Sequence, residues 1–193
     1  MAYNNIEIEI QVNIENSQPL LDFLGAQGIF KHETHQVDEY FSPHADNFLA
    51  MRPVSRWLRL RRTNQGCSFN YKNWYFDETG KSNYCDEFET KIEDIAAAKK
   101  ILEALKFNSI VVVNKVRKIW TFKDYEIALD SIEGLGDFVE IEYIGNDNQI
   151  DPRRVTDEMV SFLKDLGVGR ITRNHVGYPF IILFPNEVKY QIL

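Results

Sequence analysis

The chain of 193 residues is long enough to bury one sizeable core, which predicts a single domain spanning residues 1–193. Its composition is globular, with 44% apolar and 26% charged residues, and no apolar run approaches the ~18–20 residues that cross a bilayer. The net charge of −7 argues against general binding to nucleic acid or anionic membranes. There is no signal-peptide pattern at the N-terminus, and Cys67 and Cys85 lack metal-binding spacing. We therefore expect a cytoplasmic protein with reduced thiols.

Alternation of apolar and polar residues, which is typical of β-strands, recurs along the chain. It is clearest in IEIEIQV, residues 6–12, where every second residue is Ile or Val. In chain order we predict a strand at 5–13, a helix at 17–28, strands at 35–41, 55–63, 67–76 and 84–92, a helix at 93–107, strands at 109–121, 124–131 and 137–144, and a helix at 151–166. Residues 170–193 have no clear pattern.

Short turns join most of the predicted strands, which favours hairpins and therefore an antiparallel sheet of about eight strands. Eight strands can close into a barrel or curl toward one, and either arrangement protects the sheet edges. Helices would pack on the outer, apolar face. The predicted fold class is therefore α+β, an eight-stranded antiparallel β-barrel with helices packed outside.

Charged side chains of one sign repeat on single strand faces. Glu7 and Glu9, for example, lie two residues apart and so point the same way. The acidic positions of this kind are Glu7, Glu9, Glu87, Glu89, Asp130, Glu140 and Glu142, and the basic ones are Arg59, Arg61, Lys72, Lys115 and Arg117. Asp38, in the strand at 35–41, is expected to be structural or to line the rim.

A solvated outer face would explain any one charged strand. Such a face gains from mixed signs, however, whereas same-sign pairs repel one another. If these faces converge inside one barrel, bound ions would relieve the repulsion. Clustered carboxylates are ligands for Mg²⁺ or Mn²⁺, and Arg and Lys are ligands for phosphate. Together they predict a polyanion bound with divalent metal, most naturally a triphosphate, with the metal as Lewis acid.

The same segments resemble the CYTH superfamily, the triphosphate tunnel fold, which includes class IV adenylyl cyclases, thiamine triphosphatases and inorganic triphosphatases. The N-terminal Glu7-x-Glu9-x-Gln11 is similar to the family's ExExK signature. The resemblance extends over nearly the whole chain and is most specific in ALDSIEGLGDFVEIEY, residues 128–143. The other matching segments are HQVDEYF (35–41), WLRLRR (57–62), NYKNW (70–74), EFETKI (87–92) and VNKVRKIW (113–120).

This resemblance implies an eight-stranded tunnel with a polar interior and assigns roles to the charged residues. The triphosphate would be bound by Arg59, Arg61, Lys72, Lys115 and Arg117, with Glu87 and Glu89 in the same set. Mg²⁺ or Mn²⁺ would be bound by Glu7, Glu9, Asp130, Glu140 and Glu142. The catalytic set would be Glu7, Glu9, Lys72, Lys115, Glu140 and Glu142.

One position departs from the family pattern. Gln11 stands where the signature has lysine, so hydrogen bonding is kept and the positive charge is lost. Catalysis could be weaker, could use another basic group such as Lys72, or could concern a different substrate.

Three functions therefore stay open. The favoured one is a class IV-like adenylyl cyclase that converts ATP to cyclic AMP and pyrophosphate. The alternatives are a triphosphatase acting on thiamine, nucleoside or inorganic triphosphate, and a non-catalytic nucleotide or polyphosphate sensor. For the tail after residue 170, two roles are open: covering one end of the barrel or joining a homodimer interface.

Overall fold

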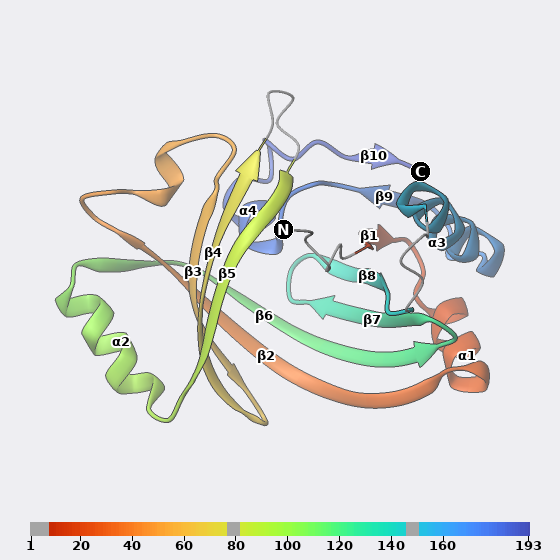
Figure 1. Ribbon diagram of the computed structural model, residues 1–193, viewed down its shortest axis with the longest axis horizontal. Coiled ribbons are helices and arrows are strands. Elements are labelled where there is room, and N and C mark those ends of the chain that lie inside the picture. The colour runs from red at the N-terminus through yellow and green to blue at the C-terminus, as the bar shows by residue number, and fades with distance from the viewer. Residues whose placement is uncertain (1–7, 77–81, 146–150) are drawn as a thin grey trace. The chain divides into compact units, whose positions relative to one another are not determined.

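A computed structural model describes residues 8–76, 82–145 and 151–193 (Figure 1). Glu7 lies outside these residues. In chain order the elements are β1 (Glu9–Ile14), α1 (Gln18–Gln27), β2 (Ile29–Pro43), the 3-10 helix η1 (Phe48–Ala50), β3 (Arg56–Thr63), β4 (Gly66–Phe76), β5 (Ser82–Ile92), α2 (Ile95–Ala104), β6 (Phe107–Phe122), β7 (Tyr125–Ile132), β8 (Gly136–Tyr143), α3 (Pro152–Leu166), β9 (Ile171–Arg173), α4 (Tyr178–Leu183) and β10 (Gln191–Ile192).

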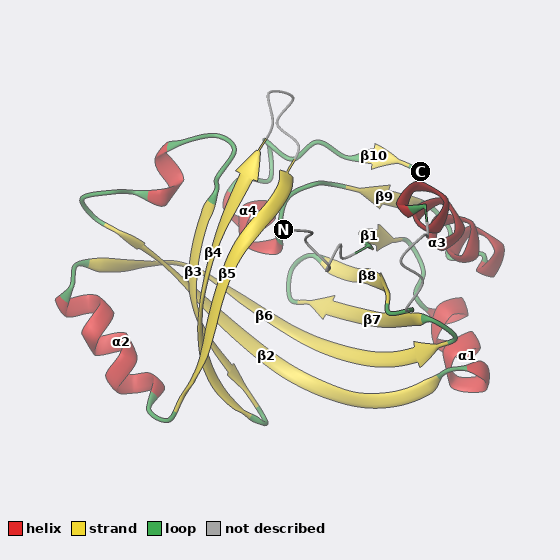
Figure 2. Cartoon of the chain, in the orientation of Figure 1, coloured by secondary structure: helices red, strands yellow, loops and turns green. Residues whose placement is uncertain are grey.

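Strands dominate the fold (Figure 2), and the eight predicted strands are confirmed as β1 to β8. The predicted helices are confirmed as α1, α2 and α3. In the described part of the chain one sheet has the order β10-β9-β1-β8-β7-β6-β2-β3-β4-β5. This order is open, with β10 and β5 as its end strands, and the two short strands β9 and β10 come from the tail that had no clear pattern.

The chain folds into two compact units. The first unit comprises Met1–Glu33, Val116–Asn174 and Lys189–Leu193, and the second comprises Thr34–Lys115 and His175–Val188. The long strands β2 and β6, which are neighbours in the sheet, each contribute to both units.

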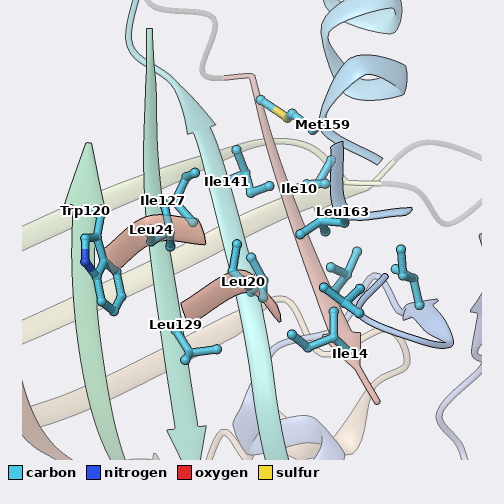
Figure 3. Packing of buried hydrophobic residues seen from close by; sticks show 14 of the residues in the cluster. Ile10, Ile14, Leu20, Leu24, Trp120, Ile127, Leu129, Ile141, Met159 and Leu163 are labelled. Atoms are coloured by element: carbon cyan, nitrogen blue, oxygen red, sulfur yellow. The ribbon is translucent and has the colours of Figure 1, made fainter. Parts of the chain in front are cut away.

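The core of the first unit lies between one face of β1, β8 and β7 and the helices α1 and α3. The register places Ile10 opposite Ile141, and Ile141 opposite Ile127, so one face of three strands is apolar. Figure 3 shows these residues with Leu20 of α1 and Leu163 of α3, both of which are fully buried. Burying a side chain of this size stabilises the fold by roughly 1.5–3 kcal/mol.

Helix α3 fits this core because of its spacing and its ends. Val155, Met159 and Leu163 recur every four residues and are buried. The side chain of Asp151 accepts a hydrogen bond from the backbone N–H of Arg153 and caps the start. Gly167 ends the helix at a φ of 77°, a left-handed conformation that glycine adopts without strain. The sequence therefore fixes which face of α3 is buried.

The core of the second unit is built in the same way on β2, β3, β4 and α2. Phe41 lies opposite Leu58, and Leu58 opposite Tyr71, which gives these strands one apolar face. Leu102 of α2 packs in the same cluster as Phe41 and Leu58. Because successive side chains of a strand point to opposite faces, the residues between these apolar positions lie on the other face. In both units that other face carries the predicted charged residues.

Candidate functional site

Cross-strand pairing arranges the polar face of the second unit in rows. Arg61 lies opposite Asp38 of β2, and Arg59 lies opposite Tyr40 of β2. The next strand continues the rows, because Asn70 of β4 lies opposite Arg59. Further rows pair Asn70 with Glu89 and Lys72 with Glu87. The structure therefore brings predicted residues of three strands onto one face, with Lys115 of β6 in the same unit.

Asp38 is the centre of this face. Its carboxylate is only 2% exposed and accepts two hydrogen bonds from Arg61, Nε to Oδ1 at 2.6 Å and Nη2 to Oδ2 at 2.6 Å. Arg59 Nη1 approaches the same carboxylate at 3.4 Å. Burial alone would raise the pKa of Asp38, but the hydrogen bonds from Arg61 and the charges of Arg59 and Lys115 outweigh it and lower the pKa. The carboxylate therefore stays ionised and fixes both guanidinium groups.

Arg59 has an unused donor. Its Nη1 lies 3.4 Å from Asp38 Oδ2 and 3.5 Å from the hydroxyl of Tyr40, whereas its buried Nε has no hydrogen-bond partner in residues 8–76, 82–145 and 151–193. Burial would lower the pKa of Arg59, but Tyr40 and Asp38 reverse the effect and raise it. A buried donor without an acceptor costs about 1–3 kcal/mol. A phosphate oxygen is an acceptor that fits this guanidinium.

Lys72 and the two acidic residues of β5 form the outer part of the same face. Lys72 Nζ lies 3.0 Å from Glu87 Oε2. Asn70 Nδ2 donates to Glu87 at 2.7 Å and to Glu89 at 3.4 Å. Desolvation raises the pKa of Glu87, but the hydrogen bonds from Lys72 and Asn70 exceed it and lower the pKa. Glu87 therefore orients Lys72, a residue with three donors, for a further acceptor.

In the first unit, Arg117 of β6 joins two predicted metal ligands. Arg117 donates from Nε and Nη2 to the two oxygens of Asp130, at 2.6 and 2.7 Å, and Asp130 is 1% exposed. The same guanidinium reaches Glu140 at 2.9 Å, and Gln11 Nε2 lies 3.4 Å from Glu140. Asp130 thus acts here as the partner of Arg117, and Glu140 is shared between Arg117 and Gln11.

A row of three carboxylates lies across the polar face of the first unit. Glu9 of β1 is opposite Glu142 of β8, and Glu142 is opposite Glu126 of β7. We call Glu9, Glu126 and Glu142 the acidic row. Directly opposed like charges destabilise a sheet unless a cation compensates them. Arg173 supplies part of this compensation. Burial lowers the pKa of Arg173, and the negative charge of Glu9 opposes this effect, which shows that the two charges attract each other.

The acidic row fits a hard divalent cation in its chemistry. In the described part of the chain no three His, Cys, Asp or Glu side chains converge closely enough to form a complete metal site. Mg²⁺ in phosphoryl-transfer enzymes is usually bound by one or two carboxylates together with substrate phosphates. Glu9 and Glu142 fit that partial ligand set.

Two residues of the site were not assigned from the sequence. Glu126 was missed, although it lies four residues before Asp130 and therefore on the same strand face. Asp38 was expected to be structural or at the rim, and the structure shows it buried between Arg59 and Arg61. The sequence pattern that could have identified Asp38 is that Asp38 and Tyr40 share one face of their strand, as Arg59 and Arg61 share one face of the next strand.

Asp38 makes stability dependent on pH in a defined window. Folding lowers the pKa of this carboxyl below its value in the unfolded chain, which is 3.8. Its contribution to the free energy of unfolding is therefore complete above pH 3.8 and is lost as the pH falls through the pKa of the folded state. We expect the difference in urea midpoint between the wild type and Asp38→Asn to be constant from pH 8 to about 5 and to shrink below about pH 4. A difference that shrinks at neutral pH would contradict this assignment.

No helix in the described part of the chain is both long and apolar enough to span a membrane.

Comparison with known proteins identifies the family. The CYTH domain profile matches residues 5–178. A protein of Methanocaldococcus jannaschii named "Putative adenylate cyclase" is 32% identical over 167 residues, which cover 86% of this chain and 91% of that protein. The structure of PH1819 from Pyrococcus horikoshii has a TM-score of 0.69 at 24% identity, covering 92% of this chain and 98% of that one.

A third protein has a similar fold. HpAC1 of Hippeastrum, named "Putative adenylyl cyclase" and described with a dominant triphosphatase activity, has a TM-score of 0.67 at 19% identity. The match covers 95% of this chain and 98% of that one. The antiparallel sheet and the four α-helices in the described part of the chain match the triphosphate tunnel fold of this family. With a profile match over most of its length, an archaeal relative at 32% identity and this fold, the chain belongs to the CYTH domain family.

Proposed function

We propose that the protein is a metal-dependent enzyme that acts on a triphosphate, and that its reaction is that of a class IV-like adenylyl cyclase, ATP to cyclic AMP and pyrophosphate. The CYTH family binds triphosphate substrates in general, which supports the substrate class. The observation that carries the proposal is the buried Nε of Arg59, a guanidinium donor without a partner in the described part of the chain. Asp38 fixes that guanidinium, so the donor is oriented before a ligand arrives.

Four residues of the second unit are proposed to bind the phosphates. We call Arg59, Arg61, Lys72 and Lys115 the basic cluster. An Arg can contact two phosphate oxygens with its planar fork, whereas a Lys acts as a point charge. Asp38 and Glu87 neutralise part of this charge without removing every donor. The cluster is therefore suited to a polyanion with several oxygens.

The first unit is proposed to supply carboxylates for the metal and a further arginine for the phosphates. Glu9 and Glu142 would hold Mg²⁺ or Mn²⁺ with phosphate oxygens, and the ion would act as Lewis acid and template. Lys115 and Arg117 are two residues apart on β6 and therefore face the same side of that strand. Arg117, fixed by Asp130, is a further guanidinium suited to a phosphate oxygen.

In the proposed cyclase reaction the ribose 3′-oxygen attacks the α-phosphorus, and the bond from this phosphorus to the bridging oxygen breaks. The hydroxyl proton passes to solvent water. The negative charge that develops on the leaving pyrophosphate is stabilised by the basic cluster.

A triphosphatase is the second candidate. HpAC1, a protein of similar fold that is described with a triphosphatase activity, supports it. Gln11, which lacks the charge of the signature lysine, instead motivates the third function, a non-catalytic sensor. Water would then attack the terminal phosphorus, and the bond from this phosphorus to the bridging oxygen would break. The diphosphate would leave, and the attacked phosphorus would be released as orthophosphate. The proposed phosphate and metal ligands stay the same.

Product analysis distinguishes these candidates. The protein is incubated with ATP and, separately, with inorganic triphosphate, each with Mg²⁺ or Mn²⁺. Cyclic AMP with pyrophosphate supports the cyclase, and release of orthophosphate supports the triphosphatase. Binding of either triphosphate without turnover indicates a sensor. If neither triphosphate binds, and Arg59→Met changes neither binding nor product formation, the proposal is wrong.

Restoring the signature lysine should raise turnover. Gln11 Nε2 lies 3.4 Å from Glu140 Oε2, and an ammonium there would replace a neutral donor by a charged one. A gain of about 1 kcal/mol in transition-state stabilisation corresponds to roughly five-fold in kcat for Gln11→Lys. Gln11→Met is the uncharged control of similar length and should give no gain. If the kcat of Gln11→Lys equals that of the wild type, the glutamine belongs to a different mechanism.

A further inference from the structure

We propose that Tyr178 positions Lys115 for triphosphate binding and that Arg52 secures Tyr178 by anchoring the segment His175–Val188. This inference rests on the proposed function, since Lys115 is assigned there to the phosphates. It adds two residues, Tyr178 and Arg52, to which that proposal gives no role. All of these residues belong to the second unit.

The first step is the contact between the ring and the ammonium. Lys115 Nζ lies 5.0 Å from the centroid of the Tyr178 ring. Lys115 is 5% exposed and Tyr178 is 7% exposed. A cation over an aromatic face gains about 0.5–1 kcal/mol when exposed and 2 or more when desolvated, so burial makes this contact strong.

The second step is what the contact does for the charged face. Lys115 acts electrostatically on Asp38, so its ammonium belongs to the environment of the basic cluster. An unrestrained lysine side chain would lose rotamer freedom on binding phosphate, which weakens binding. The ring restricts Lys115 beforehand and shields it from water. Tyr178 therefore prepares the ammonium for an anion.

The third step is the anchor. Arg52 Nε and Nη2 donate to the two carboxylate oxygens of Glu187, at 2.7 and 3.3 Å. The guanidinium carbon also lies 3.9 Å from the ring centroid of Phe184 and 5.7 Å from that of Phe180. Nη1 donates to the backbone oxygen of Leu49 at 2.7 Å, which ties the group to η1. One side chain thus joins this part of the chain to the segment that carries Tyr178.

Burial and backbone hydrogen bonds connect Tyr178 to the residues that contact Arg52. Tyr178, Pro179, Phe180 and Ile181 of α4 are buried. The backbone N–H of Phe184 donates to the oxygen of Phe180, and the N–H of Glu187 donates to that of Phe184. A displacement of the Arg52 contacts is therefore expected to move the ring of Tyr178.

The first measurement is calorimetric binding of inorganic triphosphate, with kcat and KM for whichever triphosphate the wild type turns over. Tyr178→Leu removes the ring face and should weaken binding about five-fold, the equivalent of about 1 kcal/mol, with KM raised and kcat nearly unchanged. Tyr178→Phe keeps the ring and should bind within about two-fold of the wild type. Arg52→Met should also weaken the binding of inorganic triphosphate, as Tyr178→Leu does.

Lys99→Gln is the matched control for Arg52→Met. It removes another ion pair of the second unit, in which Lys99 Nζ lies 2.7 Å from Glu39 Oε1, and it does not involve the segment 175–188. Its binding should equal that of the wild type. Equal binding by wild type, Tyr178→Leu and Arg52→Met would overturn the inference. Equal weakening by Tyr178→Phe and Tyr178→Leu would also overturn it, because the hydroxyl would then be the active group.

A second measurement needs no triphosphate. Acetylation of Lys115 by acetic anhydride, followed by mass spectrometry, should be about five-fold faster in Tyr178→Leu and Arg52→Met than in the wild type. Unchanged labelling would overturn the inference. If the wild type binds no triphosphate, the proposed function fails, and the labelling rates still decide whether Tyr178 restrains Lys115.

Discussion

Replacing Asp38 by Asn is expected to lower the free energy of unfolding by about 3–5 kcal/mol, the range for removing one partner of a buried ion pair. The reason is the burial of its partners: the side chains of Arg59 and Arg61 are 14% and 19% exposed. Without the carboxylate, two neighbouring positive charges stay desolvated and uncompensated. Urea unfolding of wild type and variant at pH 7, followed by circular dichroism, measures the difference.

Asp46→Asn is the matched control. Asp46 forms a two-pronged ion pair with Arg56 in the same unit, but its side chain is 64% exposed. Solvent screens such a pair, so its loss should change stability little. If the two variants lost equal stability, burial would not be what makes Asp38 important.

The Asp38→Asn variant should also lose affinity for inorganic triphosphate, because Arg59 and Arg61 lose their orientation.

Replacing Glu142 by Gln is expected to lower kcat about a hundred-fold or more while the fold is retained. Glu142 is the middle residue of the acidic row, opposite both Glu9 and Glu126. A Lewis-acid metal lowers a barrier by several kcal/mol, and each 1.36 kcal/mol is a factor of ten in rate. The rate at saturating substrate, measured over a series of Mn²⁺ concentrations, tests this. Partial recovery at high Mn²⁺ is the expected signature of a weakened metal site.

Asp157→Asn controls for the loss of one negative charge in the same unit. Asp157 is an exposed residue of α3, away from the acidic row in sequence and on a helix instead of the sheet. Its kcat should equal that of the wild type. A Glu142→Gln protein with full activity at low Mn²⁺ would remove Glu142 from the metal site and from the proposed mechanism.

Much of the fold could be predicted because its signals are local. Each strand from β1 to β8 has its own alternation, and α3 has a cap at Asp151 and a left-handed glycine at 167. The beginning of β2 shows where local signals end. Residues 29–33 are exposed, so no burial alternation indicates that the strand starts at Ile29 and not at 35.

The site could be predicted as a set of same-face charges but not as a set of contacts. The alternation places Arg59 and Arg61 on one strand face, and Glu140 and Glu142 on another. It does not say which residue lies opposite which, because register depends on the turns and on the packing between paired strands, not on spacing within one strand. The ion pairs of Arg61 with Asp38 and of Arg117 with Asp130 follow from that register and from burial.

The strand and helix order, the faces of the strands and the family resemblance could all be obtained from the amino-acid sequence, because each depends on residue spacing within one segment. Three features needed the folded chain: the acidic row with Glu126, the Asp38 ion pairs, and the placement of Tyr178 over Lys115. Each of these joins residues of different segments, and the pairing of segments is set by packing and hydrogen bonding across strands. For the same reason residues 170–193 had no clear pattern: their short elements are stabilised by the partners on which they pack.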